Sequence, residues 1–170
     1  MINRKSFIIG IKGLKLSKQE IKFLNQYKPW GIILFSRNLK NIKQIKSLTK
    51  KIRKIFRDKR YPIMIDQEGG RVNRLDNFIL LDHLTSEYFG KLYIKNKRQF
   101  NIMYKLFIDK TSNLLSYLGI NINTVPVLDL KYKGSSNVIG DRSYSNNSKI
   151  VSKIGDICIE NFKNNSIATV

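Results

Sequence analysis

The sequence predicts an α/β fold built on a parallel sheet. Short, wholly apolar segments recur along the chain, and each of them except the last is followed by a longer segment with apolar residues at helical spacing. Short apolar strands that alternate with amphipathic helices are typical of parallel sheets, whose strands are buried. Polar residues come directly after several of these strands. Since the C-terminal ends of parallel strands carry the functional residues of such folds, we expect a site there.

The first half of the chain contains three predicted strands and two predicted helices. One helix begins at Ser17, because Ser17 and Glu20 have the spacing of a capping box, and it ends before Pro29. The other carries apolar residues on one face. The second helix is predicted over 41–56, and the three strands are predicted over 6–11, 31–35 and 62–66.

The second half continues the alternation, with a helix that Gly119 is expected to end. The expected elements are a weakly structured loop over 68–95, a helix over 97–118, a strand over 120–130, a loop to about 146, a helix over 147–163 and a strand over 166–170. We see no linker and no internal repeat, so residues 1–170 form one predicted domain. The pattern fits a doubly wound sheet and a barrel equally well.

The net charge of +20 has two interpretations. A nucleic-acid or anionic-membrane binder is one of them. Compositional bias is the other, because residues with A/T-rich codons are abundant and Ala168 is the only alanine. The densest basic run, 50–60, keeps Ile52, Ile55 and Phe56 at helical spacing, which is typical of a solvated helix face. We therefore favour bias, expect no specific nucleic acid as partner, and keep nucleic-acid binding as the weaker alternative.

The cysteine and histidine counts limit the chemistry. Cys158 is the only cysteine and lies on the apolar side of a helical pattern, so we expect a core residue. His83 is the only histidine and falls in a poorly patterned segment, which excludes a multi-histidine metal site within this chain. No segment resembles a signal peptide or a membrane span. We expect a cytoplasmic protein with no metal, no cofactor and no membrane partner.

Candidate site residues follow three of the strands. They are Ser36–Asn38, the run from Asp66 to Arg71, and Asp129 with Gly140–Arg142 in the loop beyond it. Carboxylates there would hold hydroxyl groups, and guanidinium groups would hold a carboxylate, phosphate or amide oxygen.

Structural roles compete with binding at several of these positions. Glu68 is expected to pair with an arginine and hold the turn, and Arg37 is equally consistent with ligand contact and with joining strand ends. Without further context, Asp141 and Arg142 would be expected to pair with each other. Gly69 and Gly70 lack the Lys-Ser/Thr of a phosphate loop, so we expect them to allow a sharp turn.

Four segments together closely resemble glycoside hydrolase family 3, and most closely its bacterial cytoplasmic β-N-acetylglucosaminidases of cell-wall recycling. They are GIILFSRN (31–38), IMIDQEGGRVNRL (63–75), NINTVPVLDL (121–130) and VIGDRSYS (138–145). The resemblance covers about residues 6–170. It implies a (β/α)₈ barrel of which this chain holds about the first five β/α units, and retaining hydrolysis of terminal β-linked N-acetylglucosamine from peptidoglycan fragments.

The resemblance also assigns roles. Asp66 would hold hydroxyl groups of the sugar, and Arg74 and Arg142 would complete its pocket, whereas Glu68 and Arg71 would be scaffold. In the family, a Lys-His pair follows the fifth strand, a Pro-Gly-His-Gly loop then carries the acid/base histidine, and the nucleophilic aspartate comes later.

None of these later groups occurs in the 170 residues, so we assign no catalytic residue and expect no hydrolysis by this chain alone. A non-catalytic, sugar-binding half-barrel is the alternative function. Five parallel strands leave an open edge, and a second copy of the chain is one candidate for covering it.

Overall fold

The computed structural model describes residues 4–132, 134 and 136–170. In this part of the chain, five strands form one sheet in the order β1-β2-β3-β4-β5, and every neighbouring pair is parallel. The strands are β1 (Lys5–Gly10), β2 (Pro29–Leu34), β3 (Ile63–Ile65), β4 (Ile122–Asn123) and β5 (Ala168–Thr169). The predicted α/β fold with a parallel sheet is confirmed.

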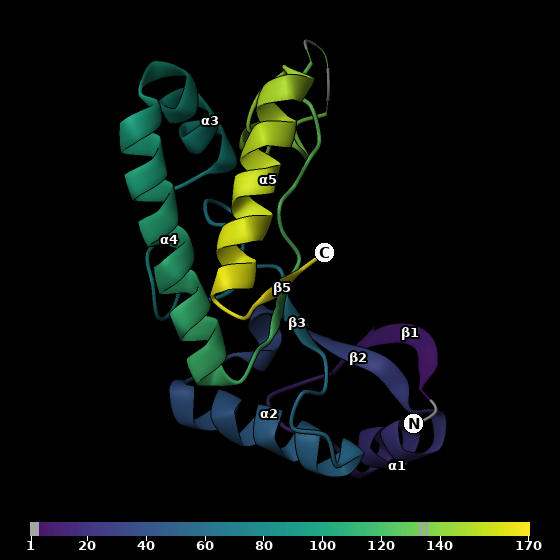
Figure 1. Cartoon of the computed structure of the whole chain (residues 1–170). Coiled ribbons are helices and arrows are strands. Elements are labelled where there is room, and N and C mark those ends of the chain that lie inside the picture. Colours follow the sequence, from purple (N-terminus) through teal and green to yellow (C-terminus); the bar gives the residue numbers. More distant parts are fainter. Residues whose placement is uncertain (1–3, 133, 135) are drawn as a thin grey trace.

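Five α-helices and two 3₁₀ turns connect the strands (Figure 1). The helices are α1 (Lys18–Tyr27), α2 (Ile42–Phe56), α3 (Ser86–Lys95), α4 (Lys97–Leu118) and α5 (Ser148–Asn164), and the 3₁₀ turns are η1 (Ser36–Asn38) and η2 (Gly140–Arg142). The predicted capping box at the start of α1 is present, with both the Ser17 and Glu20 side chains bonded to backbone N–H groups. Gly119 ends α4 in the left-handed conformation, as expected.

The strand order distinguishes a barrel-type sheet from a doubly wound one. A doubly wound sheet reverses its strand order at a switch point, whereas here each strand lies beside its predecessor. Because parallel crossovers are right-handed, an unreversed order places all connecting helices on one face of the sheet. Ile32, Leu34, Ile63 and Ile65 pack into the core on that face with no exposed surface, while Ile33 between them is only half-buried. The architecture is that of a barrel segment.

The two ends of this sheet are open within the described residues, because β1 pairs only with β2 and β5 pairs only with β4. Ile8 of β1 is 43% exposed. Self-association through an open edge stays a prediction. None of the helices in the described ranges has the length and apolarity needed to cross a bilayer.

Two predicted elements differ clearly from the structure, and the strand expected over 166–170 is limited to Ala168–Thr169. The weakly structured loop expected over 68–95 contains α3, which Thr85 caps through the backbone N–H of Tyr88. Gly90 lowers the helix propensity of this segment, and packing outweighs that cost, since Phe89 is buried against α4 aromatics.

The strand expected over 120–130 is also shorter, because only Ile122 and Asn123 are paired on both sides. Pro126, which cannot donate to a strand ladder, follows closely, and residues 124–132 form no strand.

Candidate functional site

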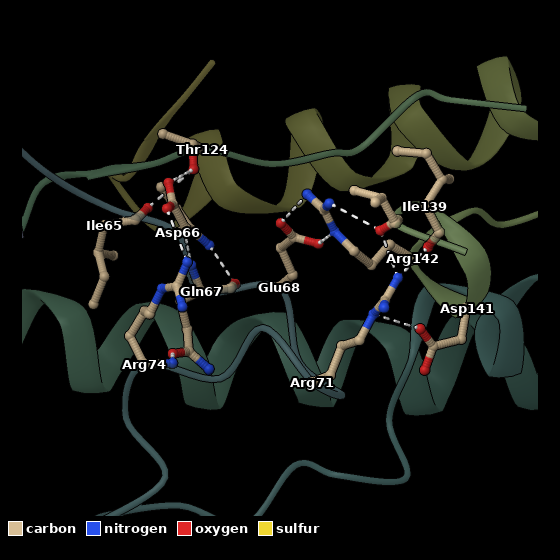
Figure 2. Close-up of polar contacts among 12 residues, drawn as sticks. Ile65, Asp66, Gln67, Glu68, Arg71, Arg74, Thr124, Ile139, Asp141 and Arg142 are labelled. Atoms are coloured by element: carbon tan, nitrogen blue, oxygen red, sulfur yellow. Dashed lines mark hydrogen bonds and ion pairs between the residues drawn. The ribbon is translucent and has the colours of Figure 1, made fainter. Parts of the chain in front are cut away.

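Asp66 stands at the C-terminal end of β3 and is held from two sides (Figure 2). Successive residues of a strand alternate between its faces, so Asp66 lies on the same side as Met64 and opposite the helix-covered core. Its Oδ1 accepts a hydrogen bond of 2.6 Å from the Thr124 hydroxyl, and its Oδ2 lies 3.3 Å from Nη2 of Arg74. A carboxylate has about four acceptor positions, so these contacts orient Asp66 and leave acceptor capacity for a ligand.

Gln67 is the residue that holds the Arg74 loop in place. Its side chain accepts the backbone N–H groups of Arg74 and Leu75, at 3.0 and 3.1 Å, and donates to Asn73 at 2.8 Å. Its own backbone N–H and carbonyl are both bound by the Asn123 side chain, each at 2.9 Å. Gln67 lies in the candidate run from Asp66 to Arg71, but the sequence assigns no role to it, and Asn123 is not among the candidate residues. Their signal was an asparagine inside an apolar strand and an amide on the core-facing position beside Asp66.

Arg142 is fixed by Glu68. Its Nη2 and Nε donate to the two carboxylate oxygens of Glu68 at 2.8 and 2.9 Å, and the Glu68 side chain is only 7% exposed. These bonds raise the pKa of Arg142, to which Asp129 and Asp66 add smaller electrostatic contributions. Glu68 therefore pairs with an arginine as predicted, and Arg142 lies within electrostatic reach of Asp66.

Arg71 and Asp141 form a second link between the same two segments. Arg71 Nε lies 3.1 Å from Asp141 Oδ1, and its Nη2 donates to the carbonyl groups of 137–139. The expectation that Asp141 and Arg142 pair with each other is wrong. Neighbouring residues of a helical turn do not face each other, and each instead contacts the segment that follows β3.

Gly69 and Gly70 make the sharp turn that brings Glu68 and Arg71 to this position. Their φ angles are +90° and +54°, a region that favours glycine. A Cβ at Gly69 would lie 2.5 Å from the Leu84 carbonyl oxygen, and one at Gly70 would lie 2.7 Å from Cγ2 of Thr85. The turn therefore needs glycine for its conformation and for close packing.

The segment after β2 is hydrogen-bonded to the segment after β1. Arg37 Nε donates to the Ile11 carbonyl at 3.1 Å, and its guanidinium lies 4.6 Å from the centre of the Phe35 ring. Asn38, which is fully buried, donates to the carbonyls of Ile11 and Gly13. Of the two roles considered for Arg37, these contacts support the structural one.

Among the described residues, His83 and Cys158 make no hydrogen bond or ion pair with Asp66, Arg74 or Arg142. His83 is exposed, and Cys158 is buried as expected. Burial raises the pKa of the Cys158 thiol to about 11, so at neutral pH it is not a thiolate nucleophile.

Comparison with known proteins gives matches over nearly the whole chain. Residues 2–170 match the sequence family described as the glycosyl hydrolase family 3 N terminal domain. A beta-hexosaminidase of Haemophilus ducreyi is 36% identical over 163 residues, which cover 95% of this chain and 46% of that protein. A beta-hexosaminidase of Hydrogenovibrio crunogenus is 33% identical over 142 residues, covering 82% of this chain and 38% of that protein.

A solved structure matches the chain as well. The crystal structure of NagZ from Neisseria gonorrhoeae in complex with N-trifluoroacetyl-D-glucosamine matches with a TM-score of 0.87 and 28% identity, over 98% of this chain and 49% of that one. The chain thus spans less than half the length of these relatives.

Proposed function

This chain belongs to glycosyl hydrolase family 3, and we propose that it binds the terminal N-acetylglucosamine unit of a β-linked saccharide through Asp66, Arg74 and Arg142. The observation that carries the proposal is the orientation of Asp66 by Thr124 and Arg74, with acceptor capacity left over at the end of a strand. The relative from Neisseria gonorrhoeae, whose structure holds a glucosamine derivative, supports the choice of sugar.

Each of the three side chains has a different part in this proposal. Asp66 accepts hydrogen bonds from sugar hydroxyl groups, which are donors that a carboxylate binds well. Arg74 and Arg142 donate to hydroxyl or amide oxygens. Nε of Arg74 is buried and has no acceptor among the described residues, a costly situation that a ligand oxygen would relieve.

The reaction proposed for the complete enzyme is retaining hydrolysis of the β-glycosidic bond. The 170 residues supply sugar binding, and the resemblance places the acid/base and the nucleophile after the fifth strand. We infer that this chain by itself binds the sugar without turning it over. The same resemblance supports peptidoglycan fragments as the natural saccharide and the cytoplasm as the compartment.

Titration of the 170-residue chain with N-acetylglucosamine, followed by saturation-transfer NMR, tests the binding site. Saturable binding is expected, and Asp66→Ala should weaken it by at least about tenfold, because a charge-assisted hydrogen bond contributes about 1.5–3 kcal/mol. Asp141→Asn is the matched control, since Asp141 contacts Arg71 and not the proposed sugar surface.

Equal binding by the wild type and Asp66→Ala would contradict the assignment of Asp66. A chromogenic β-N-acetylglucosaminide tests the second inference, and turnover that Asp66→Ala abolishes would show that these 170 residues do contain the reacting groups. Cleavage of a peptidoglycan disaccharide but not of chitobiose by the complete enzyme would support the proposed substrate source, and the reverse preference would contradict it.

A further inference from the structure

A second surface with strong chemical character lies at the opposite end of the sheet from Asp66. It is a groove of about 670 Å³, lined by α2 from Lys46 onward, by the turn after α2 and by the C-terminal end of α4. We refer to it as the basic groove. Its lining residues are Lys46, Thr49, Lys50, Arg53, Lys54, Arg57, Asp58, Lys59, Tyr117, Leu118 and Gly119. The helix C-termini stand at the N-terminal ends of the strands, so the basic groove and the sugar site do not overlap.

The charge of the basic groove is mostly positive, and Arg53 is partly compensated through its electrostatic interaction with Asp58. Six of its lining residues are Lys or Arg, and Asp58 is the single acid. Asp58 already forms an ion pair with Arg4, which lies outside the groove. None of the six cations makes an ion pair with any residue in the ranges that the structure describes. An anion bound there would not have to displace an internal carboxylate.

The cations form a regular row along α2. Lys46, Lys50 and Lys54 are four residues apart and lie along one side of the helix, and Arg57, the C-cap residue in the left-handed conformation, follows at the end of the helix. A rise of about 1.5 Å per residue separates successive side chains of this row by about 5–6 Å. A row of evenly spaced cations fits a chain of repeated negative charges better than it fits one small anion.

An exposed aromatic side chain stands beside this row. Nζ of Lys46 lies 3.8 Å from the centre of the Tyr117 ring, and Tyr117 remains 56% exposed. The end of α4 that carries Tyr117 is held against α2 by a hydrogen bond, because the buried Thr49 hydroxyl donates to the Leu118 carbonyl at 2.9 Å. Gly119 lets α2 approach, since a Cβ there would lie 2.7 Å from Oγ1 of Thr49.

We propose that the basic groove binds single-stranded nucleic acid without sequence preference, with the phosphates along the α2 cations and a base stacked on Tyr117. A positively charged groove combined with an aromatic stacking surface is the arrangement that proteins use for this ligand. An anionic membrane fits less well, because surface-lying membrane helices insert several large apolar side chains, and Tyr117 is the only large exposed one in the groove. The net charge alone would support either partner, so the inference depends on the groove and its tyrosine.

Fluorescence anisotropy of a labelled 15-nucleotide oligo(U) with the 170-residue chain tests the proposal at several KCl concentrations. The groove variant is Lys50→Gln/Lys54→Gln/Arg57→Gln, and the matched control is Lys149→Gln/Lys153→Gln/Lys163→Gln on α5, which removes the same charge. With about 0.7 counterions released per phosphate contact, the groove variant should bind roughly 10- to 100-fold more weakly at ~0.1 M salt, with a shallower salt dependence. The control should stay within about twofold to threefold of the wild type.

Tyr117→Leu provides the second, charge-neutral test. It should weaken oligo(U) binding by about fivefold or more through loss of stacking, and it should not alter the salt dependence. Equal losses in the groove and control variants would overturn the proposal in favour of general attraction to a basic protein. Unchanged binding by Tyr117→Leu would overturn it in favour of a site for any polyanion. Circular dichroism checks that each variant is folded, and N-acetylglucosamine binding should be the same in all of them.

Discussion

Two arginine–carboxylate pairs connect the segment after β3 to the η2 turn, and they differ in burial. Glu68 is 7% exposed and binds Arg142 through both of its oxygens. Asp141 is 38% exposed and binds Arg71 through one oxygen. Arg71 also donates to three backbone carbonyl groups, so it keeps partners if Asp141 is lost. The first pair should therefore matter more for stability.

Glu68→Gln is expected to lower the free energy of unfolding by about 2–4 kcal/mol, because it leaves the guanidinium of Arg142 without its buried counter-charge. Asp141→Asn should cost at most about 1 kcal/mol, since exposed pairs contribute little. Urea denaturation of both variants measures the difference. Similar losses in the two variants would contradict the importance assigned to burial.

Helix α3 connects the helical layer to the turn that carries Arg142. A Cβ added at Gly90 would collide with the backbone carbonyl of Tyr144, two residues after Arg142. The Tyr144 hydroxyl is itself buried and lies 2.7 Å from that of Tyr104 in α4. The absence of a side chain at Gly90 thus sets how closely α3 approaches the proposed sugar site.

Gly90→Ala should destabilise the protein by about 1–3 kcal/mol or more, because overpacking a close backbone contact forces one segment to shift. It should also weaken N-acetylglucosamine binding, since the shift would move Arg142. Gly13→Ala is the control, because a Cβ there meets no atom within 4 Å. Thermal unfolding and NMR titration of the two variants give the comparison, and a Gly90→Ala protein as stable as Gly13→Ala would refute the argument.

The protein as a whole should lose stability in acid. Within the described ranges, four carboxyl groups have lowered pKa values. For Glu20, burial raises the pKa, but the hydrogen bonds from the backbone N–H groups of Lys12 and Ser17 outweigh burial and lower it. The main cause of the lowered pKa is the hydrogen bond from the Arg60 N–H for Asp58, from Lys131 for Glu87 and from Lys105 for Asp109. A lowered folded-state pKa contributes stability that is present above the unfolded pKa and is lost as the pH falls through the folded one.

We therefore expect the free energy of unfolding to fall steadily from about pH 5 to pH 3, in urea titrations at constant ionic strength. Each proton taken up also adds to a net charge of +20, which increases repulsion. Asp109→Asn should be less stable than the wild type at pH 7, and the difference should shrink towards pH 3. A constant difference across this range would show that the Asp109 carboxylate contributes nothing to the acid transition.

The sequence by itself determined the α/β class, the alternation of five strands with helices apart from α3, and the position of Asp66 at a strand end, because apolar periodicity and polar strand ends are local properties. It also supported the role of Glu68 as the partner of an arginine. Local pattern could not choose between a barrel and a doubly wound sheet, since that depends on which strands become neighbours.

Only the tertiary structure decided which residues meet. The pairing of Arg142 with Glu68, the hydrogen bond from Thr124 to Asp66, and the buried amides of Gln67 and Asn123 join segments far apart in sequence. Helix α3 was missed for the same reason, because its glycine weakens the local signal and its stability comes from packing against α4. Contacts between distant segments depend on how the chain folds in space, and no short stretch of sequence specifies them.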